Sequence, residues 1–382
     1  MNAFITGAYD TAVGKLPGSS CMGLHAEAAL GALDDAGLAL GEIDGVLCAY
    51  SFTEPHLMLA SVFCEHMGIH PGTCAAIQAG GATACIMIMH AAALVASGQC
   101  QNVLAVTGDN RLSGLSRDGA VAALAEVGHP QFERPFGISV PASYALVARR
   151  YMHEYGVTSE QLAAIAVQHR QHAVLHPKAQ QRAPITVADV LASKEISSPL
   201  RMLDCCLISD GGAAVIVSSK AAAAGTRHTP VEILGAGQGH THEHIIAAPS
   251  LTDFGCKSSS AVAFARAGVT ASDIDVAEIY DSFTITLLVE LESIGFFERG
   301  SAGAAAERGE LGIRGRLPCN THGGLLSYAH SGAAGGMFHA VEAVHQLRGR
   351  ADARQVRDAK LAFVHGDGGI LSAHCSLVLG GA

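Results

Sequence analysis

Aromatic residues are scarce in this sequence: they make up 5% of its 382 residues, and tryptophan is absent. Alanine and glycine are abundant instead, and small side chains of this kind suit closely packed layers of helices and sheet. The longest apolar runs, such as residues 91–96, are too short to span a bilayer. Residues 1–7 lack a charged segment followed by a long apolar stretch, so we expect a first strand there and no signal peptide.

Basic blocks are also missing. The net charge is −10, and no run of lysine and arginine is longer than a few residues. Nucleic acid is therefore not expected as a partner. The eleven cysteines show no spacing typical of a metal site. We interpret them as buried, reduced thiols of a cytoplasmic protein.

Strand-like and helix-like segments alternate along the chain. Residues 43–49 and 103–106 have the pattern of buried strands, and residues 82–97 form an alanine-rich helical segment that ends at Gly98. This alternation predicts an α/β fold whose strands are buried on both faces.

An internal repeat divides the chain. The segment Ala-Gly-Leu at residues 36–38, with its following Glu-Ile-Asp, returns 231 residues later as Ala-Gly-Val and Asp-Ile-Asp. A second echo pairs Ala-Val-Thr-Gly-Asp at residues 105–109 with Phe-Val-His-Gly-Asp at residues 363–367. Two echoes in one order predict two similar halves, residues 1–229 and 230–382. Residues 110–200 then become an insertion in the first half, which we interpret as a loop domain that covers a site.

Four stretches, in order and over the whole length, resemble motifs of the thiolase superfamily. They are residues 204–214 (S-x-x-D-G-A-A-A-like), residues 280–284 (N-E-A-F-like), residues 320–335 (N-x-x-G-G followed by G-H-P-x-G-A-x-G-like) and residues 365–369 (C-x-G-G-G-like). The chain is most similar to the sterol-carrier or lipid-transfer branch, whose unorthodox members include a steroid side-chain aldolase. The resemblance implies the duplicated αβαβα layers of the thiolase fold and an acyl-CoA substrate.

The resemblance also implies partners. Members of this family pair through the strand before the nucleophile helix, here near residues 74–78, so we expect a homodimer. Several relatives work with a small protein built from a zinc ribbon and an oligonucleotide-binding-type barrel, and such a partner is an expectation here as well. No cofactor is expected beyond the coenzyme A moiety of the substrate.

The family nucleophile is a cysteine at a helix N-terminus, where the helix dipole lowers its pKa. Its position matches Gly81, so acyl transfer to a thiol at this position is excluded. Cys85 lies one helical turn further on. It is either a displaced nucleophile or a packing residue, because the field of the helix N-terminus fades within a turn.

The remaining family positions carry other ionisable groups. His330 matches the family histidine and is expected to donate to the thioester oxygen. Tyr280 replaces the asparagine of N-E-A-F, and His365 replaces the second cysteine; both side chains can transfer protons. Tyr328 is expected to point into the same cavity. Further residues expected along the substrate or oxyanion pocket are Gly81, Asp281, His129 and the backbone donors at Gly368 and Gly369.

Two further motifs have simpler interpretations. His240, His242 and His244 alternate as metal ligands can, but no fourth ligand stands nearby, and we interpret them as a polar loop near the acyl site. The glycines at positions 235, 237 and 239 lack the third glycine spacing and the following helix of a dinucleotide-binding turn.

Three functions remain in competition. The first is a retro-aldol lyase that cleaves a β-hydroxyacyl-CoA without a cysteine, using Tyr280, His330 and His365. The second is a conventional acyltransferase or β-ketoacyl-CoA thiolase that uses Cys85. The third is a non-catalytic subunit that binds lipid or acyl-CoA, which the retained ionisable groups make the weakest of the three.

Overall fold

The computed structural model describes residues 2–116, 119 and 127–381. The first half contributes β1 (Ala3–Asp10), α1 (Cys21–Ala36), β2 (Gly45–Ala49), α2 (Leu59–Met67), β3 (Thr73–Ile77), α3 (Thr83–Ala96), β4 (Asn102–Asn110), β7 (Asp210–Ser219) and α9 (Lys220–Ala223). Between β4 and β7 lie α4 (Arg111–Gly114), α6 (Val140–Tyr155), α7 (Ser159–Leu175), α8 (Val187–Ala192), β5 (Glu195–Ser197) and β6 (Leu200–Arg201).

The second half contributes β8 (Val231–His240), α10 (Cys256–Ala267), β9 (Val276–Ile279), α11 (Thr284–Ile294), α12 (Ala302–Glu307), α13 (Gly324–Ser327), α14 (Ala334–Leu347), β10 (Leu361–Gly368) and β11 (Ala373–Gly380).

The predicted helix at residues 82–97 and the predicted strands at 43–49 and 103–106 are confirmed as α3, β2 and β4. The segment 140–155 is helical as α6, and α7 and α8 add more helix to the insertion than its polar sequence suggests.

The strands form one nine-stranded sheet in the order β3-β2-β4-β7-β1-β8-β11-β10-β9. Each half repeats the same pairing scheme. In the first half, β1 pairs antiparallel with β7, β7 pairs antiparallel with β4, and β4 pairs parallel with β2. In the second half, β8, β11, β10 and β9 pair in the same order and with the same directions. The duplicated architecture is therefore confirmed. The boundary between residues 229 and 230 stays a prediction.

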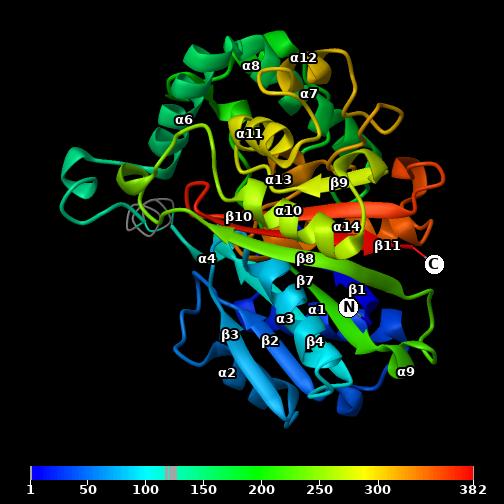
Figure 1. Ribbon diagram of the computed structural model, residues 1–382. Coiled ribbons are helices and arrows are strands. Elements are labelled where there is room, and N and C mark those ends of the chain that lie inside the picture. The colour runs from blue at the N-terminus through cyan, green and yellow to red at the C-terminus, as the bar shows by residue number, and fades with distance from the viewer. Residues whose placement is uncertain (1, 117–118, 120–126, 382) are drawn as a thin grey trace.

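The helices α3 and α14 form the middle layer of the molecule. Both contact strands of both halves and each other, whereas α1 and α2 cover the outer face of the first half and α10 and α11 that of the second (Figure 1). A helix packed between the two halves of the sheet must be largely apolar around its circumference, and α3 meets this with the sequence TACIMIMHAAALVA. The predicted five layers of the thiolase fold result from this arrangement.

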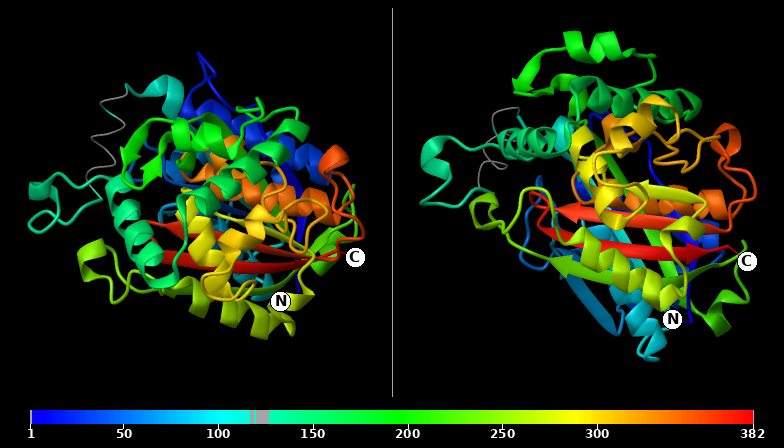
Figure 2. Two further views of the ribbon diagram at one scale, coloured as in Figure 1. Left: turned by 90° about the horizontal axis from the view of Figure 1, so that it is seen from above. Right: turned by 45° about the horizontal axis from the view of Figure 1, so that its top comes forward.

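The insertion lies over the second half. Figures 1 and 2 show α6, α7 and α8 gathered above α11, and α7 also contacts α12 and α13. Within the described residues, no helix combines the length and the apolar composition that a membrane crossing requires.

The glycine series in β8 serves close packing of a strand against a helix. A Cβ atom at Gly235, Gly237 or Gly239 would lie 2.1, 2.2 or 2.4 Å from a backbone carbonyl oxygen of the α10 segment. Such distances are far below van der Waals contact, so any side chain here would push α10 away from the sheet. This packing explains the G-x-G-x-G pattern without a nucleotide.

We predict that Gly237→Val lowers the free energy of unfolding by at least about 2 kcal/mol, because the new side chain meets the carbonyl of Ser259. Chemical denaturation measures the change. Gly41→Val is the matched control, since nothing lies within 4 Å of a Cβ atom there. Equal stability of the two variants would contradict the packing argument.

Candidate active site

A cavity of about 900 Å³ opens where the two halves and the insertion meet. The turn before α3, the segment after β9 and the loop before α14 all reach it. Its lining mixes apolar side chains with a few polar groups, a composition typical of small-molecule sites. Its polar and glycine lining residues include Gly81, Arg111, Tyr144, Cys206, Tyr280, His330, Asp367, Gly368 and Gly369.

Tyr280 and His330 form a hydrogen-bonded pair in this cavity. The Tyr280 hydroxyl lies 2.9 Å from Nε2 of His330, and the carbonyl oxygen of Leu207 lies 3.3 Å from Nδ1. Because a carbonyl can only accept, Nδ1 carries the ring proton and Nε2 is left to accept from the Tyr280 O–H. Burial, followed by the charge of Arg111, lowers the pKa of His330 to about 3, and burial raises the pKa of Tyr280 well above 10. Both groups are therefore neutral at pH 7.

The position of Tyr280 is fixed by the chain that precedes it. Tyr280 follows β9 directly, and the side-chain amide of Asn320 accepts from the N–H of Ile279 at 2.6 Å and donates to its carbonyl at 2.7 Å. The Tyr280 N–H donates to the His365 carbonyl at 3.0 Å. These bonds tie the end of β9 to the loop from residue 320 onward and to β10, so the phenol has little freedom.

The Tyr280 ring occupies the space beside Gly81. A Cβ atom at position 81 would lie 2.1 Å from Cζ of Tyr280 and 2.3 Å from the carbonyl oxygen of Asp367. No side chain fits at this position while Tyr280 stays in place. The glycine and the tyrosine are thus a matched pair, one in each half of the molecule.

His330 is held from behind by residues 206–209. The N–H of His330 donates to the Ser209 hydroxyl at 2.9 Å, and the Ser209 N–H donates to the His330 carbonyl at 3.0 Å. The thiol of Cys206 lies 3.3 Å from Nδ1 of His330 and lines the cavity. Burial raises the pKa of Cys206 to about 12, so it is a thiol and not a nucleophilic thiolate at pH 7.

Asp367 is a cavity residue that the sequence interpretation missed. The Tyr144 hydroxyl lies 2.9 Å from Oδ2 of Asp367 and 3.1 Å from the carbonyl oxygen of Gly369. Burial, together with the neighbouring carboxyl of Glu290, raises the pKa of Asp367 well above its usual value. A protonated carboxylic acid beside the Tyr280–His330 pair is an additional proton donor.

Family comparisons agree with this geometry. Residues 3–221 match the family described as "Thiolase, N-terminal domain", and residues 237–381 match "Thiolase C-terminal domain-like". The chain belongs to the thiolase superfamily.

Particular relatives of this thiolase-superfamily chain differ in activity. It is 37% identical over 363 residues to the steroid side-chain-cleaving aldolase of Thermomonospora curvata, covering 91% of this chain and 90% of the aldolase. It is 33% identical over 378 residues to an acetyl-CoA acetyltransferase of Methanothermobacter thermautotrophicus, covering 97% and 98%. The solved structure described as "Ltp2-ChsH2(DUF35) aldolase" matches with a TM-score of 0.89 and 35% identity, covering 100% of this chain and 98% of that one.

The structure brings some of the predicted thiolase-type residues together and separates others. Gly81, Tyr280, His330, Gly368 and Gly369 line one cavity, as predicted. Asp281, His129, Cys85, Tyr328 and His365 are not among the residues that line it.

His365 was expected in the cavity, and this placement is wrong. Its ring is fully buried, with Nδ1 2.9 Å from the Ser376 hydroxyl and Nε2 3.1 Å from Nδ1 of His374. The side chain lies within the strand pair β10–β11, and the chain reaches the cavity only at Asp367, further along β10. Burial, and then the charge of His339, lower the pKa of His365 to about 3.

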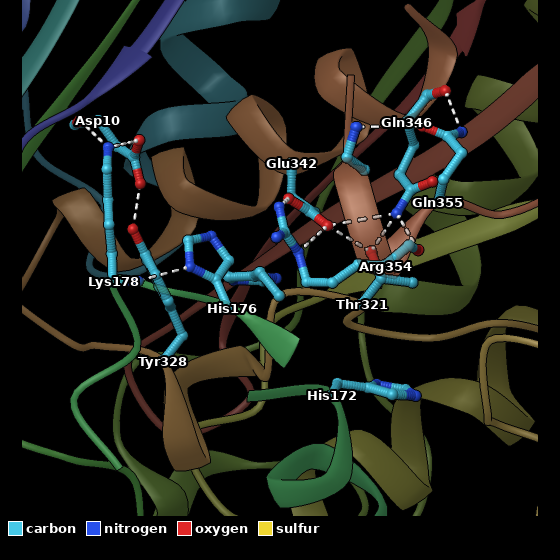
Figure 3. A network of polar contacts seen from close by, with 12 residues as sticks. Asp10, His172, His176, Lys178, Thr321, Tyr328, Glu342, Gln346, Arg354 and Gln355 are labelled. Carbon is cyan, nitrogen blue, oxygen red and sulfur yellow. Dashed lines mark hydrogen bonds and ion pairs between the residues drawn. The ribbon is translucent and has the colours of Figure 1, made fainter. Parts of the chain in front are cut away.

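Tyr328 was also expected to point into the cavity, and this too is wrong. Its hydroxyl donates to Asp10, which is paired with Lys178 at 2.8 Å, and its ring centroid lies 4.6 Å from that of His176, with the ring planes tilted by 53° (Figure 3). A separate buried network around Glu342 and Arg354 lies next to it, also drawn in Figure 3. The hydroxyl of Tyr328 therefore points away from His330, although the two residues are close in sequence.

Cys85 packs inside α3. It has no exposed surface, and burial, with the nearby Glu290, raises its pKa to about 12. A thiol in this position is neither ionised nor open to substrate. The packing alternative for Cys85 is therefore the one that the structure supports.

Asp281 supports the site from behind instead of contacting the cavity. Its carboxylate accepts from the N–H groups of Leu325 at 2.7 Å and Leu326 at 3.2 Å, and it lies 3.5 Å from His339. His339 also lies 3.4 Å from Glu278. Burial opposes the charged form of His339, but these two carboxylates raise its pKa to about 9. A buried, hydrogen-bonded ion cluster thus fixes α13, which leads to His330.

The loop histidines lie near the cavity without lining it. His129 packs against Phe132 and His244. The rings of His240, His242 and His244 bond separately to Gln238, to the Ile370 carbonyl and to the Val127 carbonyl. Among the described residues, these three do not converge as metal ligands would.

We predict that Gly81→Cys restores no thiolase chemistry. The new side chain meets both the Tyr280 ring and the Asp367 carbonyl, so it disturbs the site and lowers the melting temperature. Gly41→Cys is the matched control. Mass spectrometry after incubation with acetyl-CoA tests for an acyl-enzyme, and a stable acyl adduct on the thiol introduced at position 81 would contradict the prediction.

Proposed function

We propose that this chain is an acyl-CoA carbon–carbon lyase of retro-aldol type. The proposal depends on one observation. The phenol of Tyr280 fills the space beside Gly81, the position of the family's cysteine nucleophile, and it is hydrogen-bonded to His330. Relatives named steroid side-chain-cleaving aldolase and 17-hydroxy-3-oxo-4-pregnene-20-carboxyl-CoA lyase, 37% and 36% identical, support it.

In the proposed reaction, the substrate is a β-hydroxyacyl-CoA. The β-hydroxyl gives its proton to the Tyr280 oxygen while the Tyr280 proton moves to Nε2 of His330. The bond between Cα and Cβ breaks, the β-carbon becomes a ketone or aldehyde, and the electron pair forms the thioester enolate. A proton then returns to Cα and yields acyl-CoA; it comes from the Tyr280–His330 pair, or from Asp367, whose carboxylate then regains the proton held by the pair.

This reaction consumes no water, oxidant or thiol, so no cofactor is required besides the coenzyme A of the substrate. The absence of a thiolate at the cavity removes the step that a conventional thiolase needs. Cys85 is buried and Cys206 has a raised pKa, which argues against the acyltransferase alternative.

The acyl group is proposed to be bulky and apolar. Ile196, Met202 and Ile208 lie at the cavity and are 44%, 52% and 42% exposed. Exposed apolar side chains of this kind have an unfavourable free energy in water, and a bulky apolar acyl group bound over them would remove part of that cost. A cavity of about 900 Å³ also stands at the upper end of the range for small-molecule sites.

The test is cleavage of β-hydroxyacyl-CoA substrates, including 17-hydroxy-3-oxo-4-pregnene-20-carboxyl-CoA, with product detection by mass spectrometry. We predict that Tyr280→Phe lowers kcat/KM at least about 100-fold, because proton transfer is lost while the ring still fills its space. Cys85→Ala is expected to keep full activity.

Tyr9→Phe, the same change outside the cavity, is the matched control for Tyr280→Phe. Loss of activity in Cys85→Ala with retention in Tyr280→Phe would favour the acyltransferase alternative. Inactivity of the wild type on every acyl-CoA, alone and with a zinc-ribbon partner, would favour the non-catalytic alternative.

We further propose a homodimer through β3 and a small zinc-ribbon partner with an oligonucleotide-binding-type barrel. β3 is one of the two edge strands of the sheet, and Cys74, Ala75 and Ala76 in its middle are exposed. An edge strand with small exposed side chains is a ready site for pairing with a second copy. The relative named for both Ltp2 and ChsH2 supports a second subunit.

The free cysteines support a cytoplasmic location.

We predict that Ala75→Arg converts the dimer to a monomer, because the arginine would have to be buried between two copies of β3. Light scattering after size-exclusion chromatography measures the mass. Ala265→Arg, on the exposed side of α10, is the control and is expected to stay dimeric. A dimeric Ala75→Arg protein would exclude β3 as the contact.

A further inference from the structure

Arg111 is a buried cation at the cavity that takes no part in the proposed proton transfers. It is the first residue of α4, directly after β4, and only 5% of it is exposed. Its guanidinium carbon lies 4.7 Å from the ring centroid of Phe52. A Cβ atom at Gly332 would lie 3.4 Å from Cδ of Arg111, so the side chain is confined between these two cavity residues.

Within the described residues, this guanidinium has no acidic partner. Among the residues described, no carboxylate oxygen lies within 4.0 Å of the guanidinium nitrogens, and Nε of Arg111 is buried without a hydrogen-bond acceptor. Taking an arginine out of water without a counter-ion costs several kcal/mol. Within the part of the chain that the structure describes, this charge is therefore unpaired, and an anion that enters the cavity would stabilise it.

Two carboxylates beside the backbone of Arg111, Asp109 and Asp210, are engaged elsewhere. Asp109 accepts from the Phe52 N–H at 2.7 Å, from the Ser51 hydroxyl at 3.2 Å and from the Thr53 hydroxyl. Asp210 accepts from the N–H groups of Leu112 and Ser113 at 2.7 and 3.0 Å. Both carboxylates hold the backbone around Arg111 in place, and neither forms an ion pair with its guanidinium.

The acids on the cavity itself do not balance the charge either. Burial, together with the carboxyl of Glu290, raises the pKa of Asp367 well above its usual value and so disfavours a negative charge there. Glu243 is exposed to solvent and lies close to Gly369, not to Arg111. The positive potential of Arg111 extends to the reacting pair, since it contributes to the lowered pKa of His330. Its charge and the Tyr280–His330 pair therefore act on the same space.

We propose that Arg111 is an anion-binding subsite that holds a negatively charged oxygen of the acyl part of the substrate. Guanidinium groups bind such oxygens with two parallel N–H donors. The oxygen is either a carboxylate carried by the acyl chain or the enolate oxygen that forms during cleavage. The proposal rests on the proposed function in one respect, namely that this cavity receives the acyl group.

The first arm of the experiment is equilibrium binding, which needs no turnover. Isothermal titration calorimetry compares succinyl-CoA with butyryl-CoA, which have equal chain lengths and differ in a terminal carboxylate. If a chain carboxylate is the ligand, the wild type binds succinyl-CoA at least about tenfold more tightly, and Arg111→Met removes the difference. Arg227→Met is the control, because Arg227 pairs with Asp34 on the surface and lies outside the cavity.

The second arm detects the enolate. Exchange of the Cα protons of butyryl-CoA in D₂O is followed by mass spectrometry. If the enolate oxygen is the ligand, Arg111→Met slows exchange at least about tenfold, while Arg227→Met leaves it unchanged. Arg111→Lys, which keeps the charge, is expected to retain part of either effect and replaces the methionine variant if that protein does not fold.

Two results would overturn the proposal. One is a folded Arg111→Met protein with the carboxylate preference and the exchange rate of the wild type. The other is an equal loss of affinity for free coenzyme A, which would assign Arg111 to the coenzyme phosphates. Failure of the lyase function itself leaves a different pattern: no cleavage of any β-hydroxyacyl-CoA, with the succinyl-CoA preference still dependent on Arg111.

Discussion

The site depends on the contact between a glycine and a phenol. Gly81 has no Cβ atom, and the Tyr280 ring lies where one would stand, 2.1 Å from it at Cζ. A residue with any side chain at position 81 would displace the ring and break its 2.9 Å hydrogen bond to His330. The loss of a nucleophile and the gain of a proton-transferring phenol are thus one structural change.

The two members of this contact come from different halves of the chain. Gly81 precedes α3, Tyr280 follows β9, and His330 precedes α14. The N-terminal turns of α3 and α14 are close together: a Cβ atom at Gly336 would lie 2.6 Å from the carbonyl oxygen of Gly81. The duplicated fold therefore brings the site together, because its two central helices begin at one point.

Buried charges beneath the cavity keep this point rigid. Asp281 and Glu278 flank His339 at 3.5 and 3.4 Å, and Asp281 also accepts from two N–H groups of α13. Removing one member of such a cluster leaves another charge unpaired, which is costly in the protein interior. Arg111 differs from this cluster because, among the described residues, no carboxylate balances it, and this contrast marks it as a group directed at a ligand.

The sequence by itself determined the family, the duplicated α/β fold and three of the central positions. Gly81, Tyr280 and His330 stand in local motifs whose glycines fix the backbone, so their places could be inferred from order and spacing. It did not determine which way nearby side chains point. Tyr328 lies two residues from His330, yet its hydroxyl bonds to Asp10. His365 lies two residues before Asp367 on the same face of β10, but deeper in the core, against Ser376 and His374. Only tertiary structure decided that Asp367, Arg111 and Cys206 complete the cavity, because the contacts that place them join residues far apart in the sequence.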